Sequence, residues 1–163
     1  MIKRKIAMVG ASGVGKTSLV RQFVSGLFDE KYLTTIGVKV DEKVVHMADK
    51  EVKLLLWDVA GAEERFSIPM SYIRGATGCL LVIDGTRVET VDLGLQLWEE
   101  ILGEIGPIPF VLALNKSDLV KEWALDDAMD KRLEARQVPI VRSSAKTGQG
   151  VEEAFQALTQ CLL

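Results

Sequence analysis

Residues 10–17 read GASGVGKT and match the pattern G-x-x-x-x-G-K-[ST], which constrains the possible folds more than any other feature of the chain. Residues 5–9 (KIAMV), which resemble a buried strand, precede this motif, and apolar residues at helical spacing follow it at 18–24. A strand, a glycine-containing loop and a helix in this order form the context in which the motif binds phosphate groups. The two flanks therefore favour a phosphate-binding loop over a chance match in a turn.

The residue types within the motif suit the binding of phosphate. Gly13 and Gly15 allow the backbone to curl so that successive N–H groups point inward, and the N-terminus of the following helix adds partial positive charge. Lys16 supplies a full positive charge for the outer phosphates, and the hydroxyl of Thr17 is a ligand for Mg²⁺. The predicted nucleotide-binding residues of this segment are Ser12, Gly13, Val14, Gly15, Lys16, Thr17 and Ser18.

The rest of the chain alternates short apolar runs with amphipathic stretches. Continuous apolar strands that alternate with helices predict an α/β fold with a mainly parallel sheet covered on both faces. A turn at residues 48–50 joins two strands into a hairpin, which makes one outer strand antiparallel. The expected strands are residues 5–9, 38–47, 52–57, 78–83, 110–114 and 139–141, and the expected helices are residues 16–25, 69–73, 91–102, 125–135 and 151–163.

The length and composition indicate one ordinary globular domain. The chain has 163 residues, and its 20 Lys and Arg residues stand against 23 Asp and Glu residues without a basic block. We therefore expect no nucleic-acid partner. The two cysteines, Cys79 and Cys161, do not form a disulfide framework. The sequence has no apolar run long enough to span a membrane and no signal peptide before the first strand, so we expect a cytoplasmic protein.

Polar residues stand where the predicted strands end, which is the edge at which such sheets bind ligands. Asp58 directly follows an apolar strand. A carboxylate in this position, beside a phosphate-binding loop, holds Mg²⁺ through the water shell of the ion. The alternative is a turn or helix-capping aspartate, which is common in general. The complete set of strand-end residues is Gly10, Asp58, Asp84, Asn115 and Ser143.

Two later segments suggest that the base of the nucleotide is guanine. Asn115, Lys116 and Asp118 follow an apolar strand in the pattern N-K-x-D. A carboxylate at the last position accepts two N–H bonds from one edge of guanine, whereas adenine does not offer this pair of donors. The Lys116 side chain is expected to cover the base plane. By itself the pattern is usually a solvated turn. Its specificity comes from its order after the glycine loop and before a further segment at a strand end, which contains Ser144, Ala145 and Lys146.

Taken together, these motifs resemble those of the small GTPases of the Ras superfamily, with most similarity to the Rab branch. Residues 28–37 (FDEKYLTTIG) are similar to the first switch segment of Rab proteins, and residues 58–61 (DVAG) match the D-x-x-G of the second. Residues 71–76 (SYIRGA) are similar to the Rab stretch SYYRGA. The resemblance covers essentially the whole chain. It implies a P-loop NTPase fold with a six-stranded, mostly parallel sheet flanked by five helices.

The resemblance also implies roles for individual residues. Thr35 would ligate Mg²⁺ and meet the γ-phosphate, Gly61 N–H would contact the same phosphate, and Phe28 would cover the edge of the nucleotide. GTP or GDP with Mg²⁺ is the implied bound nucleotide. Effectors would bind switch I (Tyr32 to Val38) and switch II (Asp58 to Tyr72), and exchange factors and GTPase-activating proteins would be further partners. The implied catalytic residues are Lys16, Thr35 and Gly61, and the implied metal ligands are Thr17, Thr35 and Asp58.

The chain also departs from the family pattern. Ala62 stands where the family usually has the glutamine that orients the attacking water, so we expect slow intrinsic hydrolysis of GTP. The final residues, QCLL, place Cys161 third from the end, and no basic segment precedes it, so we expect no direct membrane anchor. Three alternatives stay open at this point: a pseudo-GTPase without turnover, a GTPase domain of a larger Roco-type scaffold, and an ATP-dependent P-loop kinase.

Overall fold

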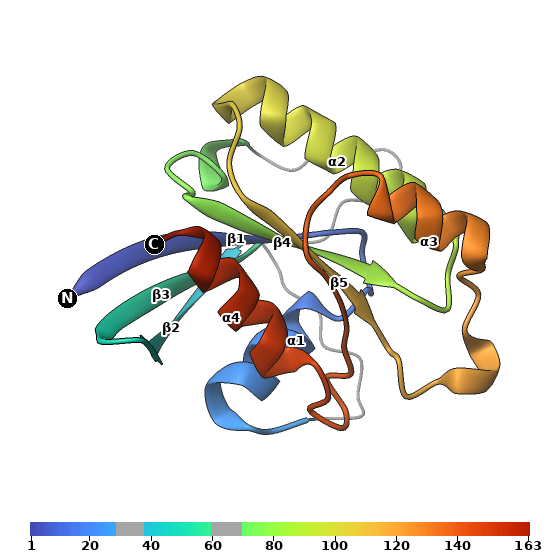
Figure 1. The fold of residues 1–163 in the computed structure, drawn as a ribbon, viewed down its shortest axis with the longest axis horizontal. Coiled ribbons are helices and arrows are strands. Elements are labelled where there is room, and N and C mark those ends of the chain that lie inside the picture. Colours follow the sequence, from blue (N-terminus) through green and yellow to red (C-terminus); the bar gives the residue numbers. More distant parts are fainter. Residues whose placement is uncertain (29–37, 60–69) are drawn as a thin grey trace.

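The computed structural model describes residues 1–28, 38–59 and 70–163, which form one six-stranded sheet with helices on both faces (Figure 1). The strands are β1 (Ile2–Val9), β2 (Val38–Met47), β3 (Lys50–Val59), β4 (Gly78–Asp84), β5 (Phe110–Asn115) and β6 (Ile140–Arg142). Their order in the sheet is β2-β3-β1-β4-β5-β6. Neighbouring strands pair in parallel, except that β2 and β3 are antiparallel. The α/β fold with one antiparallel outer strand, predicted from the sequence, is therefore confirmed.

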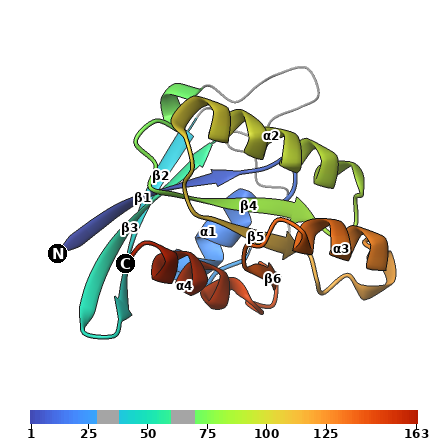
Figure 2. The ribbon, with the colours of Figure 1, turned by 45° about the horizontal axis from the view of Figure 1, so that its top comes forward.

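Four α-helices of the described residues cover the sheet. They are α1 (Lys16–Ser25), α2 (Glu89–Ile105), α3 (Asp127–Glu134) and α4 (Val151–Cys161). Helices α1 and α4 lie on one face, and α2 and α3 lie on the other (Figure 2). The resemblance implied five helices. The segment expected as the remaining one, residues 69–73, contains a short 3-10 helix at Met70–Tyr72, and Pro69 lies outside the described residues.

Several element boundaries differ from the expected ones for local reasons. β1 begins at Ile2 because residues 2–5 pair with residues 52–55 of β3. α3 begins at Asp127, two residues later than expected, because the Asp126 carboxylate accepts a hydrogen bond from the Met129 N–H at 2.9 Å and caps the helix. α1 ends where the sequence predicts, at Gly26, whose positive φ of 68° and N–H bond to the Gln22 carbonyl close the helix.

Two apolar clusters, one on each face of the sheet, hold the helices in place. All residues of β4 and β5 are buried, as expected for continuous apolar strands covered on both faces. Phe23 of α1 stacks on Phe155 of α4 with ring centroids 4.0 Å apart, and Trp98 of α2 stacks on Phe110 of β5 at 4.6 Å. These contacts pack α1 against α4 on one face and α2 against β5 on the other. Within the part of the chain that the structure describes, no helix is long and apolar enough to cross a membrane.

Candidate nucleotide-binding site

The register of the parallel strands brings the polar strand ends together at one edge of the sheet. Met8 of β1 lies opposite Asp58 of β3, and Asp84 of β4 lies opposite Asn115 of β5. Ser143, which follows β6, donates its backbone N–H to the Leu114 carbonyl at 2.9 Å. The loop of residues 10–17, called the phosphate loop below, leaves the same edge directly after β1.

The phosphate loop has the backbone conformation that its glycines allow. Gly13 and Gly15 have φ values of 77° and 103°, a region that side chains disfavour. A Cβ atom on Gly15 would also collide with the amide nitrogen of Asn115, so the close approach of these two residues requires glycine. The glycine pattern read from the sequence thus corresponds to a backbone that other residues adopt only with strain.

Each backbone carbonyl from residue 10 to residue 15 accepts a hydrogen bond. Lys16 Nζ lies 3.4 Å from Gly10 O and 3.3 Å from Ala11 O. The other four carbonyls, of Ser12, Gly13, Val14 and Gly15, accept from Arg87 Nη2 (2.8 Å), Lys116 Nζ (3.0 Å), Asn115 Nδ2 (2.9 Å) and the Leu19 N–H (2.9 Å). These contacts account for the loop's carbonyls, and in loops of this kind it is the N–H groups that bind anions.

Lys16 is almost completely buried, with 6% of its surface exposed. Burial lowers the pKa of its ammonium from 10.5 to about 8, while the negative charge of Asp58 acts in the opposite direction. Burying a cation is costly even beside a carboxylate, and an anionic ligand would relieve part of this cost. The environment of Lys16 therefore suits the binding of phosphate.

Thr17 and Asp58 bring oxygen atoms together beside Lys16. The Thr17 hydroxyl donates to Asp58 Oδ2 at 2.6 Å, and Asp58 is buried, with an exposed fraction of 1%. Hydroxyl and carboxylate oxygens are the ligands that Mg²⁺ prefers, and the ion commonly keeps several water molecules and binds phosphate oxygens as well. The donor set therefore fits Mg²⁺. Among the described residues, no group of three His, Cys, Asp or Glu side chains is arranged to hold a metal by protein ligands alone.

The two segments predicted to recognise the base lie against each other. The Ser144 hydroxyl donates to Asp118 Oδ1 at 2.8 Å, and the Thr147 N–H donates to Ser144 Oγ at 3.1 Å. Ala145 is buried, and its carbonyl accepts from Gln22 Nε2 of α1 at 2.9 Å. Lys146 is exposed at the surface of this segment. The structure thus brings together the segments 115–118 and 144–146 and ties both to the elements that carry the phosphate loop.

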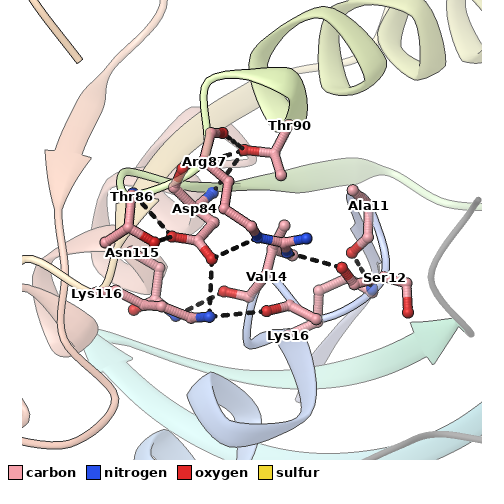
Figure 3. A network of polar contacts seen from close by, with 11 residues as sticks. Ala11, Ser12, Val14, Lys16, Asp84, Thr86, Arg87, Thr90, Asn115 and Lys116 are labelled. Carbon is pink, nitrogen blue, oxygen red and sulfur yellow. Dashed lines mark hydrogen bonds and ion pairs between the residues drawn. The ribbon is translucent and has the colours of Figure 1, made fainter. Parts of the chain in front are cut away.

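A buried charge network that the sequence did not predict joins these parts (Figure 3). Asp84 has no exposed surface, and its Oδ2 lies 2.8 Å from Lys116 Nζ and 3.0 Å from Arg87 Nε. Its Oδ1 accepts from the Thr86 N–H at 2.9 Å and the Thr86 hydroxyl at 2.6 Å. Burial by itself would raise the pKa of Asp84, but the hydrogen bonds from Lys116, Thr86 and Arg87 outweigh it and lower the pKa. The sequence held one indication of this network, because Asp84 is the last residue of a strand whose other residues are apolar.

Comparison with known proteins identifies the family of this chain. A match to the Ras family covers residues 5–163. The chain belongs to the Ras family.

Relatives within this family carry Rab names. The chain is 35% identical over 159 residues to the Ras-related protein Rab-7b of Homo sapiens, covering 94% of this chain and 79% of the relative. It is 35% identical over 160 residues to the Ras-related protein SEC4 of Saccharomyces cerevisiae (97% and 74% covered). It is 36% identical over 167 residues to the Ras-related protein RABG3f of Arabidopsis thaliana (96% and 80% covered). The Ras-superfamily and Rab-like assignment made from the motifs is confirmed.

Membership of the Ras family makes this chain a GTP-binding small GTPase, and regulators and effectors are its partners in general. The P-loop kinase alternative is thereby set aside. Several residues implied by the resemblance, including Thr35, Gly61 and Ala62, lie outside the described residues, and Phe28 is the last residue before the first gap, with 37% of its surface exposed. Of the two switch segments, the structure describes Val38 and residues 58–59 and 70–72.

Proposed function

We propose that residues 1–163 form a single guanine-nucleotide-binding domain that acts as a molecular switch and hydrolyses GTP slowly. The observation that carries this proposal is the interlocking of the phosphate loop with the segments predicted to bind the base. Asn115 and Lys116 donate to the Val14 and Gly13 carbonyls, at 2.9 and 3.0 Å. A ligand that spans both segments would be held at its phosphate end and its base end by one connected set of hydrogen bonds.

We assign the phosphate end to Lys16, Thr17 and Asp58. Lys16 would move its ammonium from the Gly10 and Ala11 carbonyls to the outer phosphates, and an adjacent anion favours the charged form of the amine. Thr17 would ligate Mg²⁺ directly, and Asp58 would hold it through water. The bound Mg²⁺ supplies charge neutralisation for the transferred phosphoryl group.

We assign the γ-phosphate contacts to Thr35 and Gly61 from the family resemblance. Thr35 would ligate Mg²⁺ in the GTP state and meet the γ-phosphate with its N–H, and Gly61 N–H would contact the same phosphate. Since both contacts need the γ-phosphate, the switch segments would order in the GTP state and relax after hydrolysis. Thr35→Ala is expected to leave GDP affinity nearly intact and to weaken the binding of GTP.

We assign guanine selectivity to Asp118. Its carboxylate, oriented by the Ser144 hydroxyl at 2.8 Å, would accept the ring N–H and the exocyclic amine of guanine. Xanthine presents a carbonyl in place of that amine, so Asp118→Asn is expected to shift the preference from GTP toward XTP. Losing these two hydrogen bonds to a charged carboxylate weakens the free energy of nucleotide binding by on the order of 2–4 kcal/mol.

Nucleotide competition tests this assignment. Affinities for GTP, XTP and ATP would be measured by displacement of a fluorescent GDP from the wild type, from Asp118→Asn and from Asp92→Asn. Asp92 is a suitable control, because its side chain is 66% exposed and pairs with Arg132 on α3. Equal affinity of the wild type for GTP and ATP, or an unchanged preference in Asp118→Asn, would contradict the assignment.

Ala62 bears on the rate of hydrolysis. A methyl side chain neither donates nor accepts the hydrogen bond that orients the attacking water, and the loss of such a contact costs about 1–3 kcal/mol, or roughly 5- to 150-fold in rate. We therefore propose slow intrinsic turnover, with a pseudo-GTPase as the second candidate function that the same residue favours. Single-turnover hydrolysis by the wild type and by Ala62→Gln separates them. If Ala62→Gln does not accelerate hydrolysis, another residue orients the water.

The surfaces for partners follow from the same assignment. We propose that effectors bind switch I (Tyr32 to Val38) and switch II (Asp58 to Tyr72), and that exchange factors and GTPase-activating proteins act at the same edge of the sheet. We further propose that the protein is cytoplasmic. A pull-down that compares the protein loaded with a non-hydrolysable GTP analogue against the GDP form tests the switch assignment.

A further inference from the structure

Arg87 lies outside every motif used so far, yet it contacts the phosphate loop. It belongs to the turn between β4 and α2, where its backbone N–H donates to the Asp84 carbonyl at 3.0 Å and its own carbonyl accepts from the Thr90 hydroxyl at 2.7 Å. Its guanidinium donates through Nη2 to the Ser12 carbonyl at 2.8 Å, across 75 residues of sequence. The backbone of Arg87 is thus fixed by its own turn while the side chain reaches a distant loop.

A single oxygen atom couples Arg87 to Lys116. Asp84 Oδ2 lies 3.0 Å from Arg87 Nε and 2.8 Å from Lys116 Nζ (Figure 3). The two cations then donate to consecutive carbonyls of the phosphate loop, Arg87 to Ser12 and Lys116 to Gly13. Asp84 has no exposed surface, while the side chains of Arg87 and Lys116 are about one third exposed, so the three groups meet at the boundary between the interior and the solvent. The position of the Ser12 carbonyl is therefore linked to that of Lys116.

The orientation of the loop depends on these carbonyls. Along a backbone, fixing one carbonyl constrains the N–H of the next residue, because both belong to the same planar peptide unit. The donors of Arg87 and Lys116 hold the peptide units between Ser12 and Val14, which carry the N–H groups of Gly13 and Val14. If the Ser12 carbonyl lost the bond from Arg87, the first of these units would lose one of the contacts that hold its orientation.

We propose that Arg87 is a positioning residue that lengthens the lifetime of the bound nucleotide, by holding the Ser12 peptide unit of the phosphate loop and, through Asp84, the side chain of Lys116. The inference rests on the proposed function, because it concerns the same guanine nucleotide. It assigns to Arg87 no contact with the nucleotide. Among the residues that the structure describes, the contacts of Arg87 do not involve the base-recognising carboxylate of Asp118.

Three consequences distinguish this role from a merely structural one. The dissociation rates of GDP and of a non-hydrolysable GTP analogue should both rise in Arg87→Ala, by roughly 10- to 100-fold, as expected for the loss of charged hydrogen bonds. The preference for GTP over XTP should not change, because the Asp118–Ser144 contact is intact. Arg87→Lys should give an intermediate rate, because an ammonium lacks the fork that donates to two acceptors in a fixed geometry.

The experiment measures the release of a fluorescent GDP from the wild type, Arg87→Ala, Arg87→Lys and Arg132→Ala in excess unlabelled GDP and Mg²⁺. Arg132 is the matched control, since its guanidinium pairs with Asp92 at 2.7 Å on the helices α2 and α3 and is partly exposed, as is that of Arg87. Thermal unfolding of the GDP-bound proteins is recorded in parallel. We expect faster release in Arg87→Ala, an intermediate rate in Arg87→Lys, and a rate within twofold of the wild type in Arg132→Ala.

Two results overturn the inference in distinguishable ways. If the wild type does not retain guanine nucleotide, the proposed function fails and the inference fails with it. If the wild type retains nucleotide but Arg87→Ala and Arg87→Lys release it at the wild-type rate, the inference alone fails, whether or not the melting temperature falls. If Arg87→Ala does not fold, the release rate of Arg87→Lys is the test. A wild-type rate overturns the inference, and a faster rate supports it.

Discussion

Replacing Asp84 by asparagine is the most demanding test of the buried network. The carboxylate has no exposed surface and accepts four contacts, two from Thr86 on Oδ1 and one each from Arg87 and Lys116 on Oδ2. An amide of the same shape has one oxygen and one NH₂ group. Whichever way the amide is turned, its NH₂ group faces two donors, so Asp84→Asn loses two of the four contacts and the negative charge.

The size of the effect follows from this count. If the amide keeps its oxygen toward Thr86, both lost hydrogen bonds are to cations, and each contributes about 1.5–3 kcal/mol, or about 3–6 kcal/mol together. The side chains of Arg87 and Lys116 are 38% and 34% exposed, so water compensates part of this loss. We therefore expect Asp84→Asn to lower the free energy of unfolding by about 3–5 kcal/mol at pH 7.

Urea unfolding of the wild type, Asp84→Asn and Asp92→Asn checks this value. Asp92 also pairs with an arginine, at 2.7 Å, but its side chain is 66% exposed, so Asp92→Asn should cost less than about 1 kcal/mol. Equal losses of unfolding free energy in the two variants would refute the reasoning, because the burial of Asp84 would then add nothing to the stability that its contacts provide.

The pH dependence has a defined sign. The pKa of Asp84 is lowered from its ordinary value of 3.8 in the folded protein, so below that pH the unfolded chain binds more protons than the folded one. The stabilisation is therefore fully present above 3.8 and is lost as the pH falls through the lowered pKa. The difference between wild type and Asp84→Asn should stay constant from pH 7 down to about 4.5 and decrease only below that.

Two further predictions concern a backbone position and a thiol. Gly15→Ala should weaken fluorescent-GDP binding more than tenfold and lower the free energy of unfolding by about 2 kcal/mol or more, because a φ of 103° is strained for alanine and the added Cβ would meet the Asn115 amide. Gly103→Ala is the control: this glycine lies in open space on α2, and the change should raise the free energy of unfolding by about 0.5–1 kcal/mol. Equal urea midpoints for the two variants would contradict this. A colorimetric thiol reagent at pH 8 should modify one of the two cysteines, the exposed Cys161, because burial raises the pKa of Cys79 to about 12; two fast-reacting thiols in the native protein would show that Cys79 is accessible.

The local patterns of the sequence were sufficient for most of the fold. The wholly apolar runs at residues 78–83 and 110–114 predicted strands covered on both faces, and β4 and β5 are buried along their whole length. Helix boundaries were less exact, because they depend on single hydrogen bonds such as that of the Asp126 carboxylate to the Met129 N–H. The short helix expected at residues 69–73 is a single 3-10 turn at Met70–Tyr72 in the described part of the chain.

The nucleotide-binding site likewise has parts that the sequence predicted and parts that it did not. The phosphate loop and the base-recognising segments could be predicted because their features are local in sequence. These features are the glycines, the lysine and the threonine of one short segment, and the N-K-x-D pattern. The contacts of Arg87 with Ser12, and of Lys116 with Asp84, join residues far apart in the chain. Such contacts depend on which strand ends lie side by side in the sheet. Only the tertiary structure decides this, because strand order and register result from the packing of the whole chain, while a glycine's φ or a lysine's charge is a property of the residue itself.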